Sequence, residues 1–83
     1  MRLNVGTTLV STQRWYWVTM EPYLNIDSWQ FAAIATWCRK TFGLPYSRDE
    51  NDGQTRWRDQ LYDGVVYFRD EADRTLFLMR WGN

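Results

Sequence analysis

The sequence predicts an α+β domain of the ferredoxin-like type, in which a four-stranded antiparallel sheet carries two helices on one face. Segments with the two-residue period of a strand alternate along the chain with segments that have helical spacing. Asp63 and Gly64 form a strong hairpin signal between two of the strands. In order, the elements read βαββαβ, and 83 residues are the length of a single small domain.

The chain begins with a polar, Thr-rich stretch, residues 1–13, which we expect to be an N-terminal arm or an edge strand. A single α+β domain is expected over residues 14–83. Its first strand covers residues 14–20, where aromatic and β-branched side chains dominate. Both faces of this strand are apolar, which indicates a central position in the sheet. Pro22 ends the strand because proline has no N–H for the ladder.

The clearest helix covers residues 27–42. Asp27 and Gln30 have the spacing of a capping box, and Gly43 stands where a helix commonly stops. Helical spacing gathers one apolar stripe that should face the core. The stripe consists of Phe31, Ile34, Ala35, Cys38 and Phe42.

A second apolar stripe follows the same helix. Trp29, Ala33 and Trp37 are spaced four residues apart and lie well away from the core stripe. A sheet covers only one side of a helix, so this stripe requires another cover. The N-terminal arm, the following loop and a partner are the three candidates.

The second half of the chain contains two more strands, a short helix and a last strand. After a loop over residues 44–54, strands are expected at residues 55–61 and 65–69. Asp70 is a good N-cap for a short helix, whose first turn is acidic. The last strand is expected at residues 77–81.

The composition removes several kinds of chemistry. The absence of histidine rules out Ser-His-Asp and Cys-His sites and imidazole acid-base catalysis. Cys38, the only cysteine, lies on the core stripe and should be a buried, inert thiol. The acidic residues 49–53 fail the EF-hand pattern because Gln54 stands at the glycine position, so we expect a solvated loop. We therefore expect no enzyme, no cofactor and no metal site.

Charge and hydropathy restrict the partners and the location. The formal net charge is zero and the isoelectric point is about 6.1, so no global field attracts a polyanion. No apolar run approaches the roughly 20 residues that span a bilayer. No secretory signal is recognisable, and we expect a soluble intracellular protein without membrane contact.

Arginine and aromatic residues are adjacent at three places: residues 14–17, 56–58 and 80–81. Such groups can stack bases of single-stranded nucleic acid on an open sheet face, or form hot spots of a protein interface. In a third interpretation, the rings pack the core and the guanidinium groups cover them. The candidate binding residues are Trp29, Trp37, Arg14, Trp15, Trp17, Arg56, Trp57 and Arg58.

The C-terminal part combines a strand and an acidic helix start at residues 67–73 with a Phe-Leu-Met-Arg-Trp-Gly sequence at residues 77–82. In this it resembles small uncharacterised proteins of tailed phages and viral metagenomes, which often end in a strand, an acidic helix start and a Phe-x-Leu-Arg-Trp motif. Trp-Cys at residues 37–38 and Phe-Gly at residues 42–43 add to the similarity, which covers residues 15–82. Met79 departs from the usual leucine. The resemblance implies a phage origin and action in the cytoplasm of a bacterial host, and it identifies no functional residue.

The leading functional hypothesis is a non-enzymatic phage accessory protein that binds a host or defence protein, with inhibition as one form of that activity. The hypothesis rests on the missing catalytic side chains, the surplus stripe of Trp29 and Trp37, and the three groups of adjacent arginine and aromatic residues. The alternative is binding of single-stranded nucleic acid on the open sheet face. A homodimer through the Trp stripe is a third hypothesis.

Overall fold

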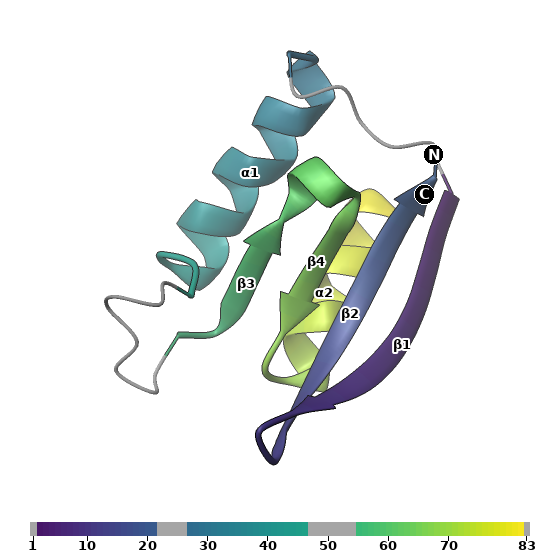
Figure 1. Cartoon of the computed structure of the whole chain (residues 1–83). Helices are drawn as coiled ribbons and strands as arrows, with labels where there is room; N and C mark the ends of the chain where they lie inside the picture. Colours follow the sequence, from purple (N-terminus) through teal and green to yellow (C-terminus); the bar gives the residue numbers. More distant parts are fainter. Residues whose placement is uncertain (1, 22–26, 47–54, 83) are drawn as a thin grey trace.

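The structure is a computed structural model that describes residues 2–21, 27–46 and 55–82. It contains four strands and two helices in these parts of the chain (Figure 1). They are β1 (Arg2–Val10), β2 (Gln13–Glu21), α1 (Trp29–Phe42), β3 (Trp57–Gln60), β4 (Val65–Phe68) and α2 (Glu71–Trp81), with a short 3-10 turn at Leu61–Asp63 before β4.

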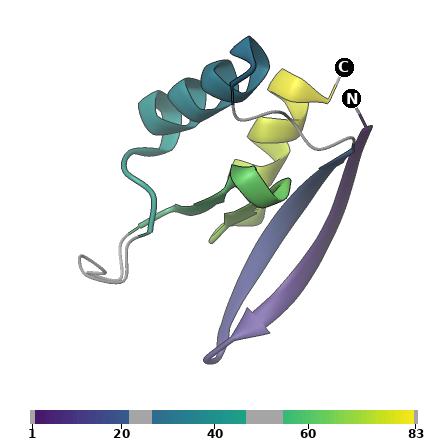
Figure 2. The same ribbon diagram turned by 45° about the horizontal axis from the view of Figure 1, so that its top comes forward.

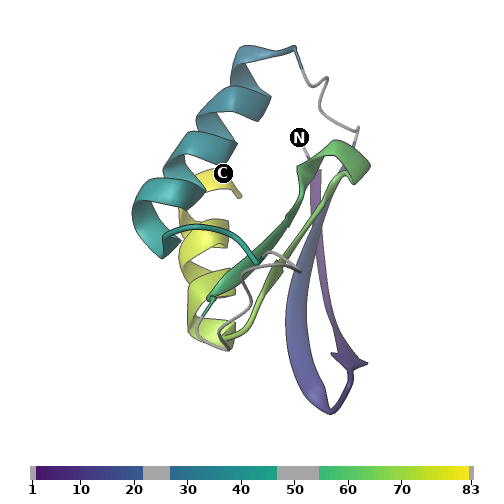
Figure 3. The same cartoon turned by 60° about the vertical axis from the view of Figure 1, so that its left-hand side comes forward.

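The strands form one antiparallel sheet in the order β1-β2-β4-β3, which confirms the α+β class and the four-stranded antiparallel sheet. β2 lies inside the sheet, as expected from its two apolar faces. Both helices lie on one face of the sheet and leave the other face open (Figure 3). The core between the layers consists of Val18, Met20, Trp57, Leu61, Val66 and Phe68 from the sheet side and Ile34, Cys38, Phe42 and Phe77 from the helices.

The element order is ββαββα and differs from the predicted βαββαβ at both ends of the chain. At the N-terminal end, β1 is a complete edge strand that pairs with β2 along nine consecutive residues. Ser11 and Thr12 form the hairpin turn with φ angles of 49° and 70°. Neither residue is the glycine or asparagine that usually signals positive φ, so the sequence did not reveal this hairpin.

At the C-terminal end, the strand predicted at residues 77–81 is wrong because these residues form the second half of α2. No Gly, Pro or Asn interrupts the chain between Glu71 and Trp81, and nothing therefore ends the helix that begins after Asp70. Phe77 and Trp81 are four residues apart, so they share one helical face turned toward the core. The Gly82 N–H donates to the Leu78 carbonyl at 2.7 Å and closes the last turn.

Helix α1 matches the prediction at its C-terminus and along its core stripe. Gly43 has a φ of 87°, and its N–H donates to the Arg39 carbonyl at 3.1 Å. The N-terminus differs, because Ser28 and not Asp27 is the N-cap: its hydroxyl oxygen accepts from the Phe31 N–H at 3.1 Å. The predicted capping box at Asp27 is therefore wrong, and the helix begins two residues later than predicted.

The connection from β3 to β4 is longer than a two-residue turn. β3 ends at Gln60, and the turn Leu61–Asp63 leads to Gly64, whose φ of 75° only glycine adopts freely. The Asp59 carboxylate accepts from the Leu61 N–H at 3.1 Å and fixes the start of this turn. The acidic residues 49–53 lie outside the described residues. Neither described helix combines the length and the apolarity that a membrane crossing requires.

Candidate binding surfaces

The outer side of α1 carries an exposed apolar surface, which we call the Trp29–Trp37 surface. It is a shallow hollow of about 480 Å³ lined by Trp29, Ala32, Ala33, Thr36, Trp37 and Lys40. Trp29 is 76% exposed, which is a large apolar area in contact with water. The lining is mostly apolar, with Lys40 at the end of the surface nearer the helix C-terminus. The second stripe predicted from the sequence is thus left open in the structure at Trp29.

Trp37 has a different environment from Trp29. Its indole makes edge-on contacts with three rings, at centroid distances of 5.4 Å to Phe42, 6.2 Å to Phe77 and 6.1 Å to Trp81. These contacts join α1 to α2 and leave Trp37 half-buried. Trp37 therefore forms a fixed floor of the surface, whereas Trp29 projects from it.

The face of the sheet opposite the helices presents a row of side chains across all four strands. The strand register aligns Gly6 of β1, Trp17 of β2, Tyr67 of β4 and Arg58 of β3. The Trp17 ring lies over Gly6 so closely that a Cβ atom at Gly6 would overlap it. Two neighbouring aromatic rings and a guanidinium group thus lie side by side on an open face.

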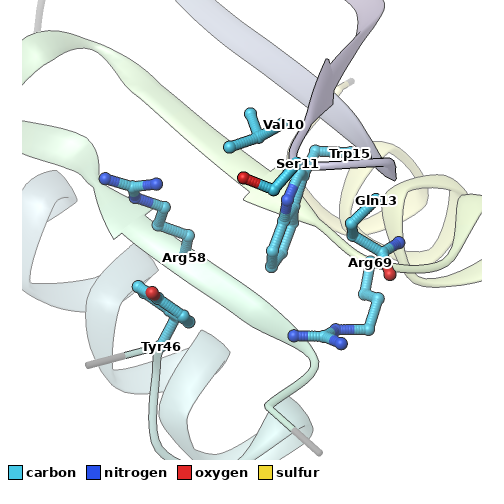
Figure 4. A pocket seen from close by; sticks show the side chains of 7 residues that line it. All are labelled: Val10, Ser11, Gln13, Trp15, Tyr46, Arg58 and Arg69. Atoms are coloured by element: carbon cyan, nitrogen blue, oxygen red, sulfur yellow. The ribbon is translucent and has the colours of Figure 1, made fainter. Parts of the chain in front are cut away.

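A hollow of about 310 Å³ lies beside this row, near the β1–β2 turn (Figure 4). Trp15 is only 6% exposed there, because Tyr46 contacts it edge-on at 6.3 Å and the Arg69 guanidinium lies 5.0 Å from its ring. Arg58 lies 5.4 Å from the Tyr46 ring. The Arg69 guanidinium therefore covers the Trp15 ring, as the third interpretation of the sequence expects, although Trp15 is not part of the core cluster. Trp17 is the more accessible tryptophan of this face.

The charge on the open face is weakly positive. Arg58 and Arg69 lie next to the aromatic residues. Among the described strand residues that alternate onto this face, Glu21 is the one acid, and it lies opposite Arg2 at the far end of the sheet. The open face therefore has local cations in a chain whose net charge is zero.

Arg56 and Trp57 have internal roles. The Arg56 guanidinium donates to both Asp73 carboxylate oxygens, at 3.0 and 2.8 Å, and ties the start of β3 to α2. These hydrogen bonds raise the pKa of Arg56 above its ordinary value, and the negative charge of Asp73 adds to the effect. Trp57 is fully buried, and its indole N–H donates to the Gly43 carbonyl at 2.8 Å. The structure therefore brings neither residue to the Trp29–Trp37 surface.

Arg14 lies at the β1–β2 end of the sheet and is exposed. Its guanidinium donates to the Thr7 hydroxyl at 3.1 Å. Since neighbouring residues of a strand point to opposite faces, Arg14 lies on the other face from Trp15. It belongs neither to the aromatic row nor to the Trp29–Trp37 surface.

Cys38 is fully buried in the core, as predicted. Burial, together with a smaller contribution from the nearby Asp59 carboxylate, raises the pKa of its thiol to about 12. The thiolate needed for a nucleophile or a metal ligand is therefore strongly disfavoured. In the parts of the chain that the structure describes, no group of three or more acidic or cysteine side chains could hold a metal ion.

Three residues of the open face are not among the candidates that the sequence indicates. Tyr67 and Arg69 could have been found, because strand alternation places them on the face opposite the buried Val66 and Phe68. Tyr46 gave no signal, since it follows a helix and a proline rather than a strand. No protein-family model, curated protein or solved structure matches this chain.

Proposed function

We propose that this chain is a non-enzymatic phage accessory protein that binds a host or defence protein in the bacterial cytoplasm, with the Trp29–Trp37 surface as the contact. The observation that carries the proposal is the 76% exposure of Trp29 on a regular helix. Tryptophan is the residue type most enriched in the hot spots of protein interfaces. The resemblance of the C-terminal part to small phage proteins supports the choice of a host partner.

The surroundings of Trp29 suit a protein partner. Ala32 and Ala33 are small, so a partner can approach the helix backbone closely beside the indole. Trp37 is held by rings of α1 and α2, which makes the floor rigid before binding. A surface that is already rigid loses little conformational entropy when a partner binds. This entropy loss is one of the costs that reduce binding affinity. Lys40 supplies a polar rim.

The test is capture of a partner by three immobilised proteins: wild type, Trp29→Ala and Leu44→Ala. Leu44 is the matched control because it is 68% exposed and follows the opposite end of α1. We expect a host protein that is captured by the wild type and by Leu44→Ala but not by Trp29→Ala. After purification, this host protein should bind the wild type directly. A set of captured proteins that is the same for all three would contradict the proposed contact.

A second candidate function is binding of single-stranded nucleic acid to the open sheet face. The row of Trp17, Tyr67 and Arg58 favours it, because these side chains are partly exposed and bases stack on accessible aromatic rings beside arginines. An electrophoretic shift assay with an unstructured oligonucleotide at two salt concentrations tests it. Binding that weakens with salt and is lost in Trp17→Ala would support this function, and no retarded band at micromolar protein would exclude it.

A further inference from the structure

We propose that two copies of this chain pair through the outer edges of their β1 strands. The two strands would run antiparallel about a two-fold axis at Thr7 and join the two four-stranded sheets into one. The pairing uses a different part of the molecule from the Trp29–Trp37 surface, and it stands independently of the proposed function.

The two edges of the sheet are built differently. β3 has only four residues, and the Tyr46 N–H donates to the outward Trp57 carbonyl at 2.7 Å, which covers part of that edge. β1 has nine residues without a proline or a bulge, and its one charged residue, Arg2, stands at its end. Proteins usually protect edge strands by shortening, charge, proline or bulges. In the part of the chain that the structure describes, β1 has none of these protections along residues 3–10 and no strand on its outer side.

The backbone of β1 offers its hydrogen-bonding groups at alternate residues. The Met20 N–H donates to the Gly64 carbonyl at 2.8 Å, so the even residues of β2 turn toward β4 and the odd residues toward β1. Trp17, an odd residue, is therefore hydrogen-bonded to its register partner Gly6. The even residues of β1 thus face β2, and its odd residues turn both N–H and C=O outward.

The outward residues of β1 are self-complementary. Val5 and Leu9 are 49% and 60% exposed, and both side chains lie on the same face of the strand. With the axis at Thr7, each Val5 lies opposite Leu9 of the second copy, so both apolar side chains of each strand gain a cross-strand partner. This register makes three pairs: Val5 with Leu9, Thr7 with Thr7, and Leu9 with Val5. Each pair joins outward residues, which exchange two backbone hydrogen bonds in an antiparallel ladder.

The shape of the molecule leaves room for this pairing. The β1–β2 hairpin extends beyond the helices, so its outer edge is accessible near the turn (Figure 2). Leu3, at the other end of β1, lies beside Gly82 at the end of α2. A register centred on Thr7 leaves Leu3 outside the apolar pairs. An axis perpendicular to the sheet places both open faces on one side of the dimer.

The first experiment measures mass by light scattering for wild type, Thr7→Pro and Thr7→Val across a range of protein concentrations. Proline removes the outward N–H at the axis, whereas valine keeps it, and both variants lose the same hydrogen bond from Arg14. We expect dimers of the wild type and Thr7→Val and a folded monomer of Thr7→Pro by circular dichroism. A wild type that stays monomeric at all concentrations would overturn the proposal.

The second experiment tests the register without relying on the proline variant. Cysteines at Thr7 would be paired residues about 5.5 Å apart between Cα atoms, within disulfide range. Cysteines at Val5 would be displaced from each other by four residues, about 13 Å along the strands. Mild oxidation should cross-link Thr7→Cys and not Val5→Cys, and the buried Cys38 should not compete. Equal cross-linking of both, or of neither, would contradict pairing centred on Thr7.

Discussion

Replacing Trp37 and Trp29 by alanine should separate a tryptophan that stabilises the fold from one that does not. Trp37 contacts Phe42, Phe77 and Trp81, and its removal leaves a void between α1 and α2. Buried aromatic-to-alanine changes cost about 3–5 kcal/mol. Because Trp37 is half-buried, we expect about 3 kcal/mol, the lower end of that range. Trp29→Ala, which removes a mostly hydrated ring, should change the free energy of unfolding by less than about 0.5 kcal/mol.

Urea unfolding followed by circular dichroism measures both changes, with equal m-values as the condition for comparison. In thermal unfolding, about 3 kcal/mol corresponds to a fall in Tm of roughly 12–24 °C for a domain of this size. If Trp29→Ala destabilised the chain as much as Trp37→Ala, Trp29 would be a structural residue. The distinction between the projecting and the fixed tryptophan of the surface would then be wrong.

Three further predictions concern the sheet, the ion pair and the thiol. Gly6→Ala should destabilise the fold by about 1–3 kcal/mol in urea unfolding, because the new methyl group overlaps the Trp17 ring; no change would show that the ring moves freely. Asp73→Asn should cost about 1–2 kcal/mol by leaving the Arg56 guanidinium with a neutral partner, and a stability equal to wild type would refute a stabilising role for the pair. Between pH 9 and about 12, unfolding releases the Cys38 proton because the thiol pKa is raised in the folded state. Stability should therefore fall by up to about 1.4 kcal/mol per pH unit, and Cys38→Ala should reduce this slope in pH-dependent unfolding.

Patterns with a local physical cause were predictable from the sequence. The core stripe of α1 followed from helical spacing, and Ile34, Cys38 and Phe42 are buried as that spacing requires. The end of α1 at Gly43 was also predictable, because a helix commonly ends at a residue with positive φ and glycine adopts this conformation easily. The second stripe was visible as well, since its spacing showed that the sheet could not cover it.

What the sequence did not reveal depended on tertiary context. Ser11 and Thr12 adopt positive φ because the long β1–β2 ladder compensates for the strain, and no residue in the turn signals this. Phe77 and Trp81 fit either a strand or a helix by composition, and contacts with α1 and the sheet decide for the helix. Among the candidate binding residues, burial of Trp57 depends on packing that spacing alone does not determine.

The proposed contact of Trp29 with a protein partner is tested by the dissociation constants of wild type, Trp29→Ala and Leu44→Ala for the captured and purified host protein. Loss of a hot-spot tryptophan costs 2 kcal/mol or more, so Trp29→Ala should bind about 30-fold more weakly or worse. Leu44→Ala should bind as the wild type does. A Trp29→Ala variant that is folded and binds with unchanged affinity would contradict a contact at Trp29.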